Sequence, residues 1–101
     1  MAEDGPGHRA VRVEENAAAS RYEISVDGVL AGFSTYRDRR DARVVLHTEV
    51  FPEFEGHGLA GELARGALAD IRGRGLRVVP RCPYVARFIK EHPEYSDLVT
   101  T

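Results

Sequence analysis

The chain has 101 residues, of which 43% are hydrophobic and 30% are charged, and its formal net charge is -2. This length fits one domain and excludes two independent cores. The near balance of 14 basic and 16 acidic residues excludes a global field that would draw the protein onto nucleic acid or an anionic membrane. No apolar run approaches the ~20 residues that span a bilayer, and the start of the chain lacks the pattern of a signal sequence. We therefore expect a cytoplasmic protein without nucleic-acid or membrane partners.

The first half of the chain predicts a mostly antiparallel meander. Residues 1–9 combine Gly, Pro and acidic residues without periodicity, and we expect a disordered tail. Asp27-Gly28 supplies a tight hairpin turn, and Gly32 marks a bulge or a close backbone approach. The charged segment 37–43, whose arginines include Arg43, is interpreted as a solvated hairpin tip. Strands are predicted at residues 11–13, 22–26, 29–36 and 44–51.

The second half predicts two helices separated by a short strand. Apolar residues over 59–71 recur at helical spacing, and Gly73 helps to close that helix. Residues 76–79 form the next strand, and a second helix starts at Pro83 and stops before Pro93. The order is therefore β-β-β-β-α-β-α, an α/β fold of the α+β type whose twisted sheet is mostly antiparallel. Its crossover places the loop before the first helix at the carboxyl end of a strand, where ligands of such sheets usually bind.

That loop, residues 55–61 with the sequence EGHGLAG, carries the strongest functional signal. Its small residues leave the backbone exposed where the first N–H groups of the helix lack partners. Free donors and the positive end of the helix dipole favour an anion, phosphate above all. The same glycines also suit a plain turn, and the lysine and Ser/Thr of a P-loop are absent. The spacing alone leaves both interpretations open.

Four segments together resemble the small single-domain branch of the GNAT superfamily of N-acetyltransferases: His47–Pro52, Glu55–Ala60, Val78–Tyr84 and His92–Tyr95. The resemblance implies that residues 10–101 form one compact GNAT-like domain that binds acetyl-CoA. It places the pyrophosphate on the glycine loop and the pantetheine arm beside the fourth strand, which would splay from the fifth to admit the thioester. The residues implied for the cofactor are Val50, Phe51, Gly56, His57, Gly58, Leu59, Ala60 and Gly61.

The chain also departs from the family's pattern. The loop opens with Glu55 where the superfamily has Arg or Gln, and a carboxylate near a diphosphate is unfavourable unless it points away. The helices that shape the acceptor pocket in the family are missing, since only residues 14–20 lie between the first two strands, and a final hairpin is missing too. The resemblance therefore leaves the acceptor unidentified. A sheet edge left open by the missing hairpin could pair with another chain, so we expect a monomer or a weak homodimer.

Cys82 is the only cysteine, which excludes an intrachain disulfide. It stands beside Arg81 and directly before Pro83, where the helix dipole and the cation favour a thiolate that could attack acetyl-CoA and form an acetyl-cysteine. Two other interpretations are a buried small hydrophobe and a residue that merely lines the thioester slot.

His47 and Glu49 share one face of their strand because side chains alternate, and together they could take the proton of an attacking amine. The alternative is a solvated or mutually satisfied pair. Tyr84 is a candidate proton donor to the departing CoA thiolate, or else a core residue. A metal site made from His47, Glu49, His57 and Cys82 lacks the short ligand spacings of zinc sites, so we expect no metal.

These observations predict an enzyme that transfers an acetyl group from acetyl-CoA to an unidentified amine, directly or through an acetyl-cysteine on Cys82. Two alternatives stay open. One is a non-catalytic sensor that binds CoA or acyl-CoA, which the missing acceptor-pocket helices favour. The other is an interaction domain whose glycine loop is only a turn.

Overall fold

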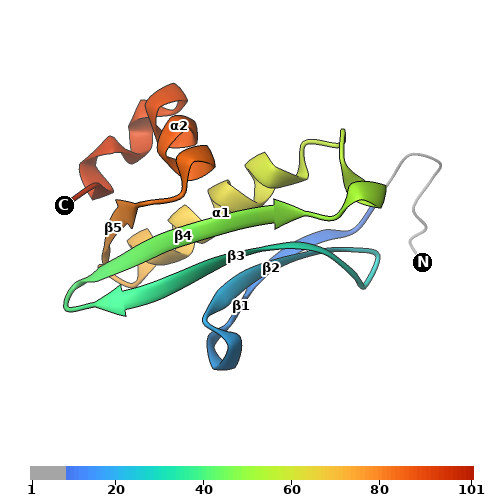
Figure 1. Ribbon diagram of the computed structural model, residues 1–101, viewed down its shortest axis with the longest axis horizontal. Helices are drawn as coiled ribbons and strands as arrows, with labels where there is room; N and C mark the ends of the chain where they lie inside the picture. Colours follow the sequence, from blue (N-terminus) through green and yellow to red (C-terminus); the bar gives the residue numbers. More distant parts are fainter. Residues whose placement is uncertain (1–8) are drawn as a thin grey trace.

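The computed structural model describes residues 9–101. Residues 1–8 of the tail predicted at residues 1–9 lie outside the described part of the chain. The elements follow the predicted order and confirm the α+β class (Figure 1). The strands are β1 (Val11–Asn16), β2 (Arg21–Val26), β3 (Val29–Arg39), β4 (Ala42–Val50) and β5 (Arg77–Pro80). The α-helices are α1 (Leu59–Gly73) and α2 (Pro83–Glu91), and short 3-10 helices are η1 (Ala17–Ala19), η2 (Pro52–Phe54) and η3 (Pro93–Leu98).

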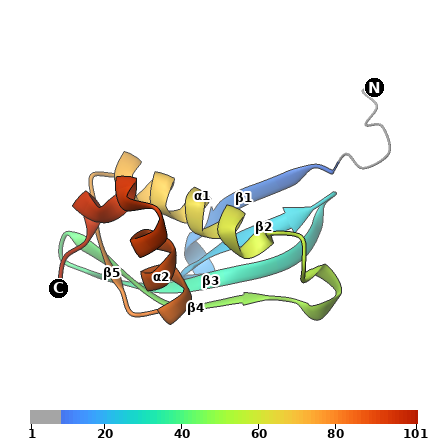
Figure 2. The ribbon, with the colours of Figure 1, turned by 90° about the horizontal axis from the view of Figure 1, so that it is seen from above.

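The strands form a single mixed sheet in the order β1-β2-β3-β4-β5. Neighbours from β1 to β4 are antiparallel, and β5 is parallel to β4, as the crossover through α1 requires. Both α-helices pack against the same face of the sheet, and neither lies over the other face (Figure 2). The core therefore lies between α1, α2 and that face, where Ile24, Leu63 and Val78 are fully buried.

The outer edge of β5 is partly covered. Val99 forms a parallel bridge with Val78, and the Thr100 amide donates to the Val78 carbonyl at 2.9 Å. The chain after α2 thus occupies part of the edge that the missing hairpin was expected to leave open.

On its inner edge, β5 separates from β4 midway along β4. Their parallel register ends at the pair Val45–Pro80. The Arg81 amide then donates to the Val79 carbonyl of β5 itself at 3.0 Å. The Cys82 amide, in place of the Arg81 amide, donates to the Val45 carbonyl of β4 at 2.9 Å. Because α2 starts directly after Cys82, β5 does not pair with the second half of β4. The expected splay of these two strands is confirmed.

A bulge in β4 sets which side chains face the helices. The β3–β4 register shifts by one residue at Leu46, which changes the phase of the alternation. Val45 is buried in the core before the bulge, and Thr48 and Val50 face the helix side after it.

Gly32 marks both features that were predicted for it. The β2–β3 register shifts beside it, and an added Cβ would lie 2.4 Å from the Glu49 carbonyl oxygen. At this position only glycine lets β3 approach β4 so closely.

Arg43 is buried, so its interpretation as part of a solvated hairpin tip is wrong. Its side chain is 6% exposed. The guanidinium makes a two-pronged contact with the Asp38 carboxylate at 2.7 and 3.0 Å, and its Nη1 donates to Glu15 at 3.0 Å and to the Tyr22 hydroxyl at 2.9 Å. The ring of Tyr36 lies against the guanidinium carbon at 3.9 Å. These partners replace the water that Arg43 loses on burial.

The Arg43 cluster (Glu15, Tyr22, Tyr36, Asp38 and Arg43) also ties α1 to the sheet. The Tyr22 hydroxyl donates to the Asp70 carboxylate on α1 at 2.7 Å. Burial raises the pKa of Tyr36 to about 12, and burial raises the pKa of Tyr22 well above its ordinary value. Both phenols therefore stay protonated and act as donors at neutral pH.

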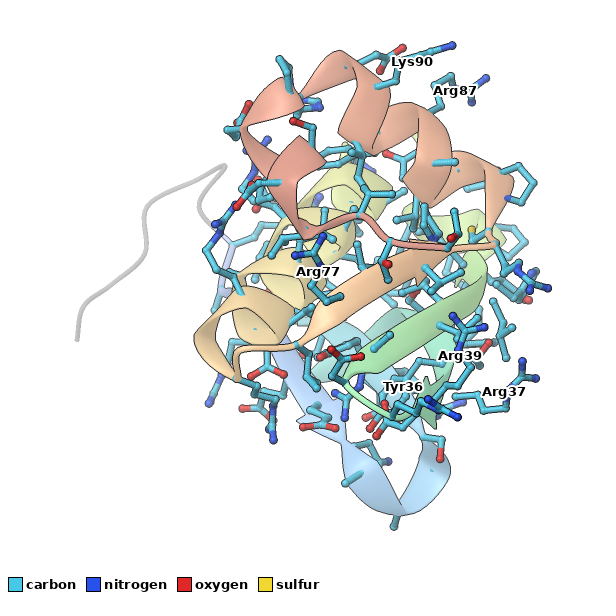
Figure 3. The ribbon with its side chains drawn as sticks, turned by 90° about the vertical axis from the view of Figure 1, so that its left-hand side faces the viewer. Tyr36, Arg37, Arg39, Arg77, Arg87 and Lys90 are labelled. Carbon is cyan, nitrogen blue, oxygen red and sulfur yellow. The ribbon has the colours of Figure 1, made fainter. Side chains whose placement is uncertain are left out.

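The other arginines of the hairpin fit the solvated interpretation. Figure 3 shows Arg37 pointing away from the body of the protein, and both Arg37 and Arg39 are exposed. The Arg39 guanidinium donates to the Thr101 carbonyl at 2.9 Å. The turn itself is shorter than predicted, since only Arg40 and Asp41 separate β3 from β4 and Arg40 adopts a φ of 55° to close it.

None of the helices within residues 9–101 is long and apolar enough to cross a membrane.

The Arg43→Met variant is expected to lose about 3 kcal/mol of unfolding free energy, because removing one partner leaves the carboxylates around it uncompensated. Urea denaturation measures this loss. The matched control is Arg37→Met on the exposed side of the hairpin, for which we expect a change within about 0.5 kcal/mol. Equal losses in the two variants would contradict the role of the cluster.

The loss should also depend on pH. The hydrogen bond from Arg43 holds the pKa of Asp38 below its ordinary value. A depressed carboxyl pKa stabilises the fold above the unfolded pKa of about 4, and that contribution disappears as the pH falls through the folded value. The difference between wild type and Arg43→Met should therefore shrink below about pH 4.

Candidate functional site

A cavity of about 330 Å³ opens between the second half of β4, the loop before α1 and the start of α2. Its lining residues include Thr48 and Val50 at the carboxyl end of β4, where β4 has left β5. Six of the eight residues implied for the cofactor line it, and Phe51 and His57 are not among the lining residues. The lining residues are Thr48, Val50, Phe54, Glu55, Gly56, Gly58, Leu59, Ala60, Gly61 and Tyr84.

The loop presents its backbone to this cavity. Gly56 and Gly58 have φ values of 86° and 73°, the left-handed region that favours glycine. Gly58 is the N-cap of α1 and offers no side chain to cap the helix. The first backbone bond of the helix runs from the Glu62 amide to the Gly58 carbonyl at 3.2 Å, so the N–H groups of residues 59–61 lack partners within the helix.

These amides therefore form a run of donors at the positive end of α1. Within the part of the chain that the structure describes, no hydrogen bond joins the N–H groups of residues 56–61 to a protein acceptor. An anion with several oxygen atoms is the ligand that such an arrangement favours. His57 lies between the two glycines and is exposed.

Glu55 lines the cavity beside those donors. Its carboxylate is the one negatively charged side chain among the lining residues, and it opposes an anion in the cavity unless it turns outward. Within residues 9–101, no group of three or more His, Cys, Asp and Glu residues is arranged to hold a metal ion.

The β4 wall of the cavity is formed by Thr48 and Val50. The amide of the next residue, Phe51, donates to the Ala31 carbonyl on β3 at 2.8 Å. Since backbone groups of a strand point alternately to its two edges, the Val50 amide points toward the edge that β5 leaves open. The Phe51 amide is therefore bonded within the sheet, and the Val50 amide faces the free edge.

Thr48 of this wall contacts a second hydroxyl group and a thiol behind it. Thr48 Oγ1 is 3.0 Å from Ser34 Oγ on β3, and Cys82 Sγ donates to Thr48 Oγ1 at 3.5 Å. Ser34 and Cys82 are 2% and 3% exposed. Thr48 and Ser34 were not among the residues predicted from the sequence, although Thr48 alternates with His47 and Glu49 in the predicted strand. The bulge that sets its direction has no clear sequence signal.

Cys82 is the N-cap residue of α2, at the predicted place. It belongs to the buried core cluster and is not among the lining residues of the cavity. Thr48 contacts both the cavity and the thiol. A nucleophilic role for Cys82 stays a prediction.

Tyr84 lines the cavity one residue into α2 and packs with Phe88 in the apolar stripe of that helix. Burial raises the pKa of Tyr84, so its phenol remains a proton donor at neutral pH. An added Cβ at Gly61 would lie 3.7 Å from the Tyr84 hydroxyl, which places the phenol beside the first turn of α1.

His47 and Glu49 are in contact, with Nε2 of His47 3.3 Å from Oε1 of Glu49. They lie on the face of β4 opposite to Thr48 and Val50, because side chains alternate along the strand. Both side chains are exposed, at 61% and 49%. The ring of Phe33 lies 6.2 Å from the His47 ring on this uncovered face.

Comparison with known proteins gives this geometry a context. A family model described as GCN5-related N-acetyl-transferase matches residues 21–98. Protein NATD1 of Bos taurus is 29% identical over 85 residues, which cover 82% of this chain and 75% of that protein. Protein NATD1 of Homo sapiens is 27% identical, with the same coverage of both chains.

Two solved structures resemble the fold. A GCN5-like N-acetyltransferase candidate from Staphylococcus aureus, solved by NMR, superposes with a TM-score of 0.68 at 19% identity, covering 88% of this chain and 87% of that one. A GNAT family acetyltransferase from Brucella melitensis, crystallised with acetyl-CoA, gives a TM-score of 0.54 at 25% identity over 71% of this chain and 54% of that one.

The first of these structures confirms the GNAT-like fold that the resemblance implied. The family model covers the chain from β2 to the end of η3, and so includes the splayed strands, the glycine loop and both α-helices. The chain therefore belongs to the GCN5-related N-acetyltransferase family.

Proposed function

We propose that this protein binds acetyl-CoA in the cavity between β4 and α2 and transfers the acetyl group to an amine. The observation that carries this proposal is the run of unbonded amides over residues 56–61 at the cavity wall. It offers a diphosphate the donors and the dipole that it needs. The acetyl-CoA bound to the Brucella melitensis relative supports the same ligand.

The pantetheine arm lies beside the free edge of β4 in this proposal. Thr48 and Val50 form the cavity wall there, and β5 no longer occupies that edge. The arm thus takes the place of a strand, and the Val50 amide is available to it. This path leads the thioester from the glycine loop toward the point where the Cys82 amide bonds to Val45.

We favour direct attack by the amine over an acetyl-cysteine route. The amine nitrogen attacks the thioester carbon, the carbon–sulfur bond breaks, and the sulfur leaves as a thiolate. Tyr84 is placed to protonate that thiolate, since its phenol lines the cavity and stays protonated. His47 and Glu49 would take the proton of the amine, directly or through water, if the acceptor approaches from the uncovered face of the sheet.

Binding and transfer are tested separately. CoA at 100 times its dissociation constant should stabilise the protein by about 2.7 kcal/mol, which a thermal-shift measurement detects. Release of CoA thiol from acetyl-CoA in the presence of an amine library then tests transfer. The absence of a shift at millimolar CoA would contradict the proposal, and a shift without transfer to any amine would favour a CoA-binding sensor.

Cys82→Ala should retain most of the transfer rate, because Cys82 is buried behind Thr48 and the direct route does not use the thiol as a nucleophile. We expect less than about a tenfold loss, which corresponds to 1.4 kcal/mol. Cys82→Ser, which keeps a donor toward Thr48, is the matched control. A variant that binds CoA normally but has lost transfer completely would overturn the direct route in favour of the acetyl-cysteine.

Gly61→Ala separates ligand binding from stability. An added Cβ meets only Tyr84 and Phe88 at 3.7 and 3.8 Å, which is ordinary contact, so the fold accommodates it. We expect stability to rise by up to about 1 kcal/mol from helix propensity. CoA affinity should fall at least about tenfold, because the methyl group blocks the approach of the diphosphate to the amides.

The control for that experiment is Gly73→Ala at the other end of α1, where nothing lies within 4 Å of the added Cβ. It should leave CoA affinity unchanged. Normal CoA binding by Gly61→Ala, measured by calorimetry, would remove the glycine loop from the proposed site.

Glu55→Gln should bind CoA more tightly, because it removes a carboxylate that lines the cavity beside the proposed diphosphate. We expect about a tenfold gain at low salt that diminishes as salt is added. Glu53→Gln makes the same charge change at a residue that is not among the lining residues, and should have no effect. Equal affinity of Glu55→Gln and wild type would mean that Glu55 points away from the diphosphate.

A further inference from the structure

Thr48 is the polar side chain that the sheet presents to the cavity. The other lining side chains with polar atoms, Glu55 and Tyr84, come from the loop and from α2. Thr48 stands on the free edge of β4, on the cavity side of Ser34 and Cys82. Its side chain is therefore the first polar side chain of the sheet that a thioester meets on the proposed path.

The hydrogen atoms around Thr48 Oγ1 can be assigned by elimination. The Cys82 thiol donates to this oxygen. Ser34 is 2% exposed, and its hydroxyl contacts the Thr48 hydroxyl. A buried hydroxyl that gives its hydrogen to nothing is costly, so Ser34 also donates to Thr48.

Two donors then occupy both lone pairs of Thr48 Oγ1. Each of these two contacts already holds the hydrogen of the neighbour, so the hydrogen of Thr48 itself points to neither Ser34 nor Cys82. The Thr48 side chain borders the cavity. Donation by both neighbours strengthens the hydroxyl as a donor, since hydrogen bonds in a chain polarise one another.

We propose that Thr48 is a catalytic residue that donates this hydrogen to the thioester carbonyl oxygen of acetyl-CoA, and that Ser34 and Cys82 are positioning residues that aim it. This inference rests on the proposed function. When the amine nitrogen bonds to the carbonyl carbon, the electron pair of the C=O bond moves to the oxygen, and the Thr48 hydroxyl faces the charge that forms. The charge returns to the carbonyl as the carbon–sulfur bond breaks.

A vibrational measurement tests this without knowledge of the acceptor. Acetyl-CoA labelled with ¹³C at the thioester carbonyl is bound to the protein, and the C=O stretch is recorded by isotope-edited infrared difference spectroscopy. We expect a shift to lower frequency in wild type, its loss in Thr48→Val and its return in Thr48→Ser, which keeps the hydroxyl. Ser34→Ala should give an intermediate shift because one of the two aiming donors is gone.

Thr35→Val is the matched control. It makes the same substitution on the neighbouring strand, one residue from Ser34 and therefore on the opposite face of the sheet. The carbonyl shift should be that of wild type. Circular dichroism of each variant shows that the fold is retained, and Thr48→Ser keeps the test valid if the valine variant unfolds.

Binding constants for CoA and acetyl-CoA complete the test. The thioester carbonyl is absent from CoA, so Thr48→Val should leave CoA affinity unchanged while the transfer rate falls about 10²-fold. A wild-type carbonyl shift that persists in Thr48→Val overturns the inference. An equal loss of affinity for CoA and acetyl-CoA in this variant also overturns it, because the hydroxyl would then bind a pantetheine amide. Failure of acetyl-CoA to bind wild type would instead contradict the proposed function.

Discussion

The hydrogen bond from the Cys82 amide to the Val45 carbonyl determines how this small domain makes a site. Regular pairing would bring the Arg81 amide to that carbonyl, but Arg81 turns back to Val79 and the chain leaves the sheet one residue later. The Cys82 bond thus ends the ladder and starts α2 at the same point. The proposed place of the pantetheine arm depends on the free edge of β4 that results.

The Arg43 cluster supports the opposite end of that strand. An opened sheet loses ladder bonds, and β4 must still hold its direction through the region where it has a partner on one side only. Arg43 joins β4 to β2 through Tyr22 and to the hairpin through Asp38, while Tyr22 reaches α1 through Asp70. The buried charge network therefore closes one end of the domain, and the unpaired half of β4 lies at the other.

The sequence was sufficient for the order of the elements, the glycine loop and the place of Cys82, because each depends on local chemistry such as proline at a helix start or glycine at a helix cap. It was insufficient for Arg43 and Thr48. An arginine in a charged segment predicts solvent exposure, and its burial follows from Tyr22 and Glu15, which are distant in sequence. The direction of Thr48 depends on the bulge at Leu46, which only the pairing with β3 reveals.

The two faces of the sheet divide the chemistry. On the helix face, the proposed ligand site combines the backbone amides of the glycine loop with the side chains of β4 and α2 that line the cavity. On the uncovered face, His47 and Glu49 stand on β4 and Phe33 lies beside them on β3, and neither α1 nor α2 lies over that face. In the proposed function, an acceptor that reaches the thioester from this side meets these three side chains. Acceptor choice would therefore lie in the side chains of that face, and donor choice in the backbone of the glycine loop.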